Sequence, residues 1–206
     1  MRRFLLILSL VLILTSVWLF STVAAVEPAQ RNIVYIHVPA AVCSLVCFGV
    51  LFVCSIQYLR TKRGVWDYTA AASAEVGLVF ATALNVTGMI FAYAEWGLWW
   101  TFSPRLISSA ALWFLYAAYC LLRSAFADRR RKEQISAVFG IIAFIDVPLV
   151  IISARFIRDI HRPSVGFESA AQTLTLVLAV CGTLLLAWIL IRIRADILKI
   201  KTEMDT

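Results

Sequence analysis

Polar sequence is scarce in this chain. Of its 206 residues, 62% are hydrophobic and only 15% are charged, and the mean hydropathy is +0.89. Soluble domains are about 45–50% apolar, so this composition indicates a protein that crosses a membrane several times. The few residues outside the apolar runs leave no room for a soluble catalytic domain. Any function must therefore lie in the helices and their short loops.

Several signatures of other protein classes are also missing. The sequence has no P-loop pattern, which argues against nucleotide binding, and it has no internal repeat or low-complexity tract. Its five cysteines all fall in apolar runs, and an odd number buried in lipid argues against a disulfide framework. Cys43 and Cys47, four residues apart, could bind a metal or act in redox chemistry. Small apolar side chains used for helix packing are the simpler interpretation.

Six apolar segments are long enough to cross a bilayer, which takes about 20 residues. They are Phe4–Val26, Val38–Leu59, Tyr68–Ala94, Leu106–Leu122, Ile135–Ala154 and Ser169–Ile191. We therefore expect an all-α fold, with residues 1–206 forming one domain of six transmembrane helices. Arg2 and Arg3 before the first run resemble the start of a signal peptide. That run exceeds the usual length of about 7–15 residues, which favours a retained anchor.

The net charge of +7 does not indicate nucleic-acid binding, because the basic residues alternate between loops. Fourteen of the 19 precede the first span or follow the second, fourth and sixth: Arg2, Arg3, Arg60, Lys62, Arg63, Arg123, Arg129, Arg130, Arg131, Lys132, Arg192, Arg194, Lys199 and Lys201. The positive-inside rule predicts that this face is cytoplasmic. Both termini would then lie inside and three loops outside, with the basic face able to contact anionic lipid of the bilayer.

A few polar residues fall inside the predicted spans. A charge at membrane depth costs about 3 kcal/mol on insertion scales, so it tends to face the bundle or a cavity. Asp146 could relay protons or anchor an outer site. The structural alternative is a helix–helix hydrogen bond, helped by Pro148, which frees a backbone carbonyl about one turn earlier. We expect Glu75 and Asn85 to be structural.

The second outer loop, at about Glu95–Arg105, concentrates aromatic residues. It carries Trp96, Trp99 and Trp100 within five residues, whereas an aromatic belt would spread such side chains over all helix ends. On a short amphipathic helix the three tryptophans would share one face and offer a flat platform to a planar ligand. Arg105 could pair with a carboxylate of that ligand or extend toward lipid headgroups.

The only two histidines, His37 and His161, lie on the same predicted face as this loop. His37 precedes Val38 and Pro39, and proline there would suit the first turn of the second span. Neutral imidazole is a standard axial ligand of haem iron, so the pair and the aromatic loop together suit a bound haem. Interfacial histidines and tryptophans without a ligand would look similar. No C-x-x-C-H motif is present, which argues against covalent attachment of haem to this chain.

Taken in order, these motifs resemble the CcmC family, haem-handling membrane proteins of cytochrome c maturation. The resemblance rests on five stretches: Ile36-His37-Val38-Pro39-Ala40-Ala41, Trp96-Gly97-Leu98-Trp99-Trp100, Arg105-Leu106 with Phe114-Leu115-Tyr116, Ile145-Asp146-Val147-Pro148, and the sequence around His161. Six spans is the number expected for the family. One stretch departs from the family signature Trp-x-Trp-Asp, because Phe102 replaces the last tryptophan and Ser103 replaces the aspartate.

The resemblance implies a protein that presents haem b at the outer face of the bacterial inner membrane, or of the mitochondrial one. His37 and His161 would be the axial ligands, Trp96, Trp99 and Trp100 would contact the porphyrin, and Arg105 is a candidate for a propionate. The partners implied are a membrane-anchored periplasmic haem chaperone (CcmE-like), the membrane and ATPase subunits of an ABC transporter (CcmB- and CcmA-like) and a small single-span subunit (CcmD-like). The task would be transfer of haem rather than catalytic turnover.

Two other functional classes stay open at this point. One is a haem-b electron-transfer subunit of a quinone-linked enzyme, which would usually hold its histidines within helices rather than at their ends. The other is a scaffold or permease subunit without a cofactor, whose tryptophans are only interfacial.

Overall fold

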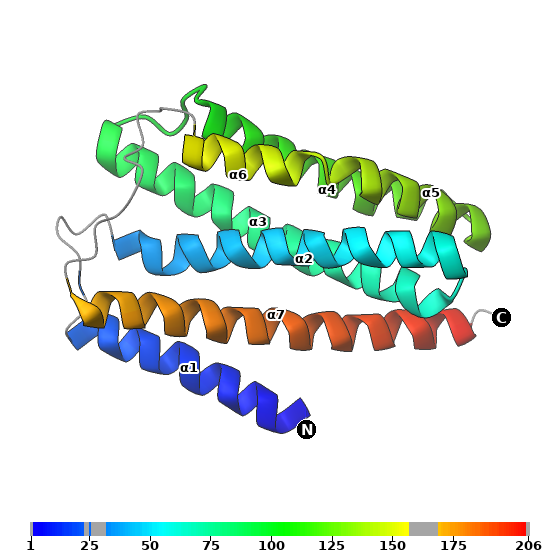
Figure 1. Ribbon diagram of the computed structural model, residues 1–206, viewed down its shortest axis with the longest axis horizontal. Helices are drawn as coiled ribbons and strands as arrows, with labels where there is room; N and C mark the ends of the chain where they lie inside the picture. The colour runs from blue at the N-terminus through cyan, green and yellow to red at the C-terminus, as the bar shows by residue number, and fades with distance from the viewer. Residues whose placement is uncertain (1, 23–24, 26–31, 157–168, 205–206) are drawn as a thin grey trace.

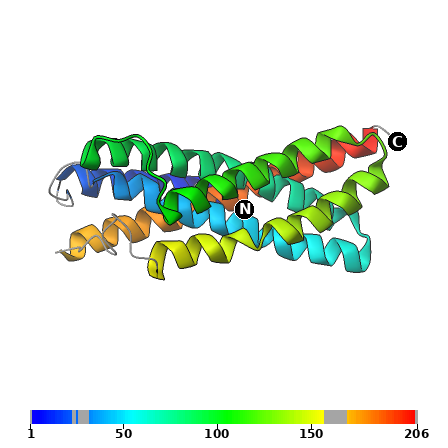
Figure 2. The ribbon, with the colours of Figure 1, turned by 90° about the horizontal axis from the view of Figure 1, so that it is seen from above.

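The computed structural model describes residues 2–22, 25, 32–156 and 169–204, and every regular element in these parts is a helix. The helices are α1 (Arg2–Thr22), α2 (Val34–Thr61), α3 (Gly64–Trp96), α4 (Pro104–Ala125), α5 (Arg129–Ala143), α6 (Asp146–Phe156) and α7 (Ala170–Met204). They form an elongated bundle (Figures 1 and 2). Within the described residues, six helical stretches are long and apolar enough to cross a membrane, with α5 and α6 sharing one of them. The described residues thus confirm the predicted all-α fold and provide six candidate membrane spans.

The bundle has two distinct ends (Figure 1). At one end, α3 and α4 are joined by residues 97–103, which hold two of the loop tryptophans, and α2 and α7 begin there. We call this the tryptophan end. At the other, α2 passes into α3 through Lys62 and Arg63, α4 passes into α5, and α7 ends. We call this the turn end.

Helices α2 and α3 form a tightly packed antiparallel pair that runs between the two ends. Their closest approach requires a glycine, because a Cβ atom at Gly77 would lie 2.6 Å from Cε1 of Phe48 and 2.9 Å from Cβ of Cys47. Phe48 is fully buried and stacks on Tyr116 of α4, with ring centroids 3.5 Å apart and planes at 4°. This contact ties the pair to the rest of the core.

Helix α1 packs mainly along α7 (Figure 1). The hydroxyl of Ser9 donates to the carbonyl oxygen of Gly182 at 3.0 Å, and Gly182 has no side chain to hold α1 away. Small residues at such a crossing let two helix backbones approach closely in a membrane. The first predicted span therefore joins the bundle through α7.

The fifth predicted span, Ile135–Ala154, is not one continuous helix. Helix α5 ends at Ala143, and α6 begins at Asp146 after a two-residue break. Pro148 has no backbone N–H to donate one turn back. The carbonyl of Phe144 accepts instead from the N–H of Val147 at 3.1 Å. This bond reaches three residues back, so it closes a tighter turn than the four-residue bond of an α-helix. The proline thus explains the break that the apolar pattern concealed.

The polar residues inside the spans have different roles. Glu75 pairs with Arg194 of α7 at 2.5 Å, and Asn85 accepts from the hydroxyl of Ser109 of α4 at 3.2 Å, so both join helices as predicted. For Asp146, the expected helix–helix hydrogen bond is not found at Oδ2, which is buried without a partner among the residues that the structure describes. Asp146 begins α6, where a carboxylate interacts favourably with the helix dipole.

The turn end holds an ion-pair network. Arg123 of α4 donates two hydrogen bonds to the carboxylate of Asp67 of α3, at 2.6 and 2.8 Å. Glu133 of α5 accepts from the hydroxyl of Tyr58 and from Arg129, each at 2.7 Å. Arg129 also donates to the hydroxyl of Tyr68 of α3 at 2.8 Å. Arg123 and Arg129, which mark the predicted inner face, thus also connect helices.

The buried cysteines of α2 have a packing role. Cys43 and Cys47 are free thiols that lie almost fully buried against Ala72, Ala187 and Ile191. No cluster of three or more potential metal ligands occurs among the described residues. The burial of Cys43 and Cys47 among apolar side chains fits the interpretation of helix packing.

Candidate functional site

His37 lies in the first turn of α2, at the tryptophan end of the bundle. The helix begins four residues earlier than the predicted span, so Pro39 falls in its second turn and not its first. The His37 side chain is partly buried. His37 therefore lies at the start of a regular helix, which confirms its predicted place at the end of this span.

The His37 ring is held against α3. Its Nδ1 atom lies 2.9 Å from the hydroxyl oxygen of Thr87. The neighbouring residue, Gly88, leaves room for the ring, because a Cβ atom there would lie 3.3 Å from Cε1 of His37. The ring edge that carries Nδ1 and Cε1 therefore faces α3, and both contacts come from consecutive residues.

The tryptophan loop is not a short amphipathic helix. Trp96 is the last residue of α3, and Gly97 ends the helix in the left-handed conformation with φ of 71°. The N–H of Gly97 donates to the carbonyl of Tyr93 at 2.9 Å, which is a common way of closing a helix C-terminus. Trp99 and Trp100 follow in non-helical chain, so the proposed shared face of three tryptophans at helical spacing is wrong.

The three indole rings have different surroundings. Trp96 packs edge-on against Phe91, with centroids 5.6 Å apart. Trp99 stacks on Tyr93 at 4.4 Å and 12°, yet 53% of its surface is exposed. Trp100 is partly buried. One face of the Trp99 ring is thus covered from within the protein, and the residue still presents much of its surface to the outside.

Of the two residues that depart from the family signature, Ser103 has a clear structural role. Ser103 is the N-cap of α4, and its hydroxyl accepts from the N–H of Leu106 at 3.4 Å. Aspartate and serine are comparable N-caps, so the replacement preserves the start of this helix. Phe102 is 86% exposed. Arg105 follows in the first turn of α4 and is partly buried.

The structure brings part of the predicted site together. His37 and Trp96, Trp99, Trp100 and Arg105 lie at one end of the bundle. The His37 ring contacts Thr87, which lies nine residues before Trp96 on α3. The ring is therefore about 13 Å from Trp96 along the helix axis. His161 lies outside the described residues. The second proposed ligand therefore stays a prediction from sequence.

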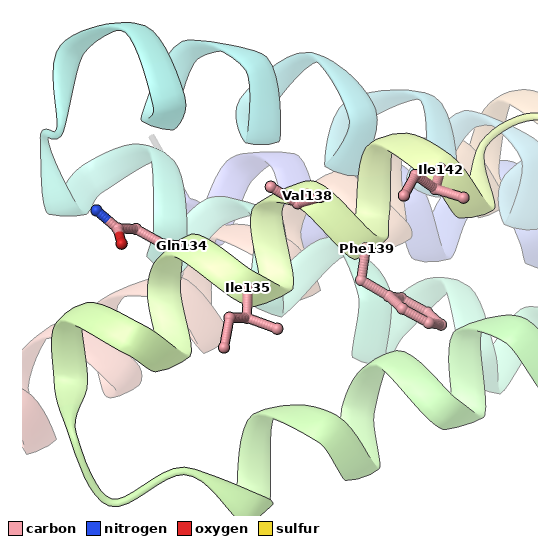
Figure 3. A pocket seen from close by; sticks show the side chains of 5 residues that line it. All are labelled: Gln134, Ile135, Val138, Phe139 and Ile142. Atoms are coloured by element: carbon pink, nitrogen blue, oxygen red, sulfur yellow. The ribbon is translucent and has the colours of Figure 1, made fainter.

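A shallow hollow elsewhere on the bundle has a different character. It runs along α5 and is lined by Gln134, Ile135, Val138, Phe139 and Ile142 (Figure 3). The side chains of Ile135, Val138 and Ile142 are exposed, as lipid-facing residues of a span would be. Its lining is almost wholly apolar and offers no imidazole or thiolate, so it does not compete with the tryptophan end as a metal-ligand site.

Thr87 and Gly88 are site residues that the sequence reasoning missed. Neither residue type suggests a ligand, and both are ordinary in a membrane helix. The signal that could have found them is register. Helices α2 and α3 are joined by a turn of two residues, and His37 and Gly88 lie equally far from it, about 25 residues on either side. Residues so placed meet in an antiparallel helix pair.

Comparison with known proteins bears on the resemblance. The whole chain, residues 1–206, matches the CcmC family, described as Heme exporter protein C. Heme exporter protein C of Escherichia coli strain K12 is 29% identical over 164 residues, covering 78% of this chain and 67% of the relative. That of Rhodobacter capsulatus is 29% identical over 187 residues, covering 86% and 77%. A ccmC-like mitochondrial protein of cytochrome c biosynthesis from Marchantia polymorpha is 29% identical over 133 residues, covering 65% and 56%.

Proposed function

The chain belongs to the CcmC family of haem exporter proteins, and from this premise we propose that it binds haem b at the tryptophan end of the bundle and hands it on during cytochrome c biogenesis. In this proposal His37 and His161 are the axial ligands of the iron. The observation that carries the proposal is the His37 ring, held at the head of α2 through Nδ1 and at the same end as the tryptophan loop.

The described residues fit the needs of a haem cargo. Its iron needs a nitrogen ligand, and a neutral imidazole held through Nδ1 can offer Nε2. Its porphyrin needs an aromatic or apolar surface, which Trp99 and Phe102 present. Its propionates need a cation, and we assign Arg105 to that role. Trp96 and Trp100, which are both partly buried, would contact the porphyrin from the protein side of the site.

We further propose that the tryptophan end faces the periplasm. The turn end carries Arg60, Lys62 and Arg63 at one connection and Arg129, Arg130, Arg131 and Lys132 at the other, which supports a cytoplasmic location by the positive-inside rule. Both termini would then be cytoplasmic, in a bacterial inner membrane. The haem site would open toward the compartment where cytochromes c receive their haem.

The proposed partners follow from family membership. A membrane-anchored periplasmic haem chaperone would receive the haem, and the membrane and ATPase subunits of an ABC transporter and a small single-span subunit would complete the assembly. The exposed position of Trp99 and Phe102 supports transfer at this surface, because a carrier can reach a haem that is not enclosed. The protein acts by holding and releasing its cargo, and nothing in the proposal requires covalent chemistry on this chain.

The test is an absorption spectrum of the purified protein in detergent, with and without added haem. We expect the wild type to bind haem stably, and His37→Ala and His161→Ala each to lose most of it. Cys181→Ala serves as a control, because this exposed thiol of α7 is remote from the tryptophan loop in sequence and lies in a different helix. Normal haem occupancy in both histidine variants would contradict the proposal.

The same preparation separates the other two classes. Rapid reduction of the bound haem by a quinol would favour an electron-transfer subunit. A wild-type protein that never acquires a haem spectrum would favour a scaffold without a cofactor. Neither result is expected if the protein is a haem carrier.

A further inference from the structure

We propose that Thr87 is a positioning residue that fixes His37 in the tautomer protonated on Nδ1, so that Nε2 is the nitrogen offered to a haem iron. The inference rests on the proposed function for its ligand, but its structural part concerns only the two side chains. It assigns a role to a residue of α3 that neither the sequence motifs nor the tryptophan loop includes.

The Thr87 hydroxyl has an acceptor for its proton within its own helix. A hydroxyl has one proton to donate. The Thr87 oxygen lies 2.7 Å from the carbonyl oxygen of Ala83 and 3.1 Å from that of Leu84, both in the preceding turn of its own helix. Threonine in a membrane helix commonly donates to such a carbonyl. With its proton used in this way, the hydroxyl can only accept a hydrogen bond from His37.

The contact with Thr87 sets the tautomer of the His37 imidazole. The hydroxyl oxygen lies 2.9 Å from Nδ1, a normal distance for an N–H···O hydrogen bond. If the oxygen accepts, Nδ1 must carry the proton, and in a neutral ring Nε2 then carries the lone pair. Metal-bound histidines almost always donate their other N–H to a carboxylate, a backbone carbonyl or a water, which fixes the tautomer and the ring orientation. The Thr87 oxygen would take the place of such an acceptor.

Gly88 sets the position of the His37 ring relative to α3. Gly88 follows Thr87, and the missing side chain lets the His37 ring lie against the backbone of α3. A methyl group there would lie 3.3 Å from Cε1, closer than the optimum of about 3.5–4.0 Å between carbon atoms. Thr87 thus sets which nitrogen is protonated, and Gly88 sets how closely the ring approaches.

The tautomer can be read directly in the full-length protein without haem. The chain has only two histidines, so labelling with ¹⁵N-histidine gives two sets of imidazole signals, each with Nδ1 and Nε2, and His161→Ala identifies the set of His37. We expect Nδ1 of His37 to be protonated in the wild type and in Thr87→Ser, which keeps the hydroxyl. In Thr87→Val, which keeps the shape, we expect a shift toward protonation on Nε2.

The consequence for the ligand is measured by titrating the same variants with haem. Loss of such an outer contact typically weakens metal binding by about 10- to 100-fold, and we expect this loss for Thr87→Val. Thr87→Ser should restore most of the affinity. Thr69→Val is the matched control, since Thr69 also lies on α3 and its hydroxyl donates to the carbonyl of Val65 in the preceding turn.

A second matched pair tests the position of the ring. Gly88→Ala should weaken haem binding and shift the absorption spectrum of the complex, because the new methyl group displaces the His37 ring. Gly49→Ala should do neither, because a Cβ placed there meets nothing within 4 Å beyond its adjacent residues and the backbone of its own helix. Both variants add the same methyl group to a membrane helix, so a general effect on helix stability would appear in both.

The outcomes separate this inference from the function on which it rests. If His37 in the wild type is protonated on Nε2, or if Thr87→Val leaves both the tautomer and the haem affinity unchanged, the role of Thr87 is refuted while haem binding through His37 can stand. If the wild type binds no haem, or His37→Ala binds it normally, the proposed function and the role of Thr87 toward haem both fail.

Discussion

The packing of α2 on α3 leads to a quantitative prediction for Gly77→Ala. The added methyl carbon would lie 2.6 Å from Cε1 of Phe48 and 2.9 Å from Cβ of Cys47, about 1 Å inside the optimum separation of carbon atoms. Phe48 cannot easily move away, because it is fully buried and stacked on Tyr116 at 3.5 Å. The two helices must therefore separate or shift.

The magnitude follows from two opposing effects. Overpacking of a core typically costs about 1–3 kcal/mol, whereas replacing glycine by alanine inside a helix gains about 1 kcal/mol. Gly77→Ala should therefore lower the free energy of unfolding by up to about 2 kcal/mol. Gly49→Ala has only the favourable effect, because the space around it is open. The two variants should differ by about 1–3 kcal/mol.

The assay is thermal or denaturant unfolding in detergent micelles, followed by far-ultraviolet circular dichroism. Gly77→Ala should melt below the wild type and Gly49→Ala at or above it. We also expect Gly77→Ala to weaken haem binding, since the α2–α3 register holds His37 against Thr87. Equal stability of the two variants would refute the close approach of the helices at Gly77.

Three further predictions concern the turn end and the tryptophan loop. Asp67→Asn leaves Arg123 buried without its carboxylate and should cost about 3–5 kcal/mol in an unfolding experiment, most of which the double variant Asp67→Leu/Arg123→Met should recover; a loss under 1 kcal/mol would contradict the pairing. Ser103→Ala should destabilise the protein by about 0.5–2 kcal/mol through loss of the α4 cap, whereas Ser103→Asp should not. Equal melting temperatures of Ser103→Ala and the wild type would argue against the cap. Trp99→Ala should weaken haem binding by about 0.5–1.5 kcal/mol in a titration, and by more than Trp96→Ala does, because Trp99 is the more exposed ring. A larger loss in Trp96→Ala would indicate that haem contacts the end of α3 instead.

The helical architecture could be predicted from the sequence because it follows from composition and length. The apolar runs are long enough to span a bilayer, and a backbone in lipid must satisfy its hydrogen bonds within each segment. Details at helix ends were less accessible. Gly97 ends α3 one residue after Trp96, and Pro148 helps to break the fifth span, although both residue types are known signals for such breaks.

Contacts between helices were the part that the sequence could not provide. The sequence pattern marks Arg123 and Arg129 as topology signals, yet Arg123 also pairs with Asp67 of α3, and Arg129 also donates to the hydroxyl of Tyr68 of α3. Which residues meet depends on the rotation of each helix about its axis, and an apolar pattern that is nearly uniform around a membrane helix does not define it. The pairing of His37 with Thr87 is accessible only once the α2–α3 register is considered.

The central claim is that His37 and His161 bind the iron of a haem at the tryptophan end. The most direct measurement is the near-infrared magnetic circular dichroism and electron paramagnetic resonance of the haem-loaded protein, which together identify the axial ligands. We expect two imidazole ligands in the wild type and only one on the haem that His37→Ala retains, with added imidazole restoring the second ligand. Unchanged bis-imidazole spectra in His37→Ala would contradict it.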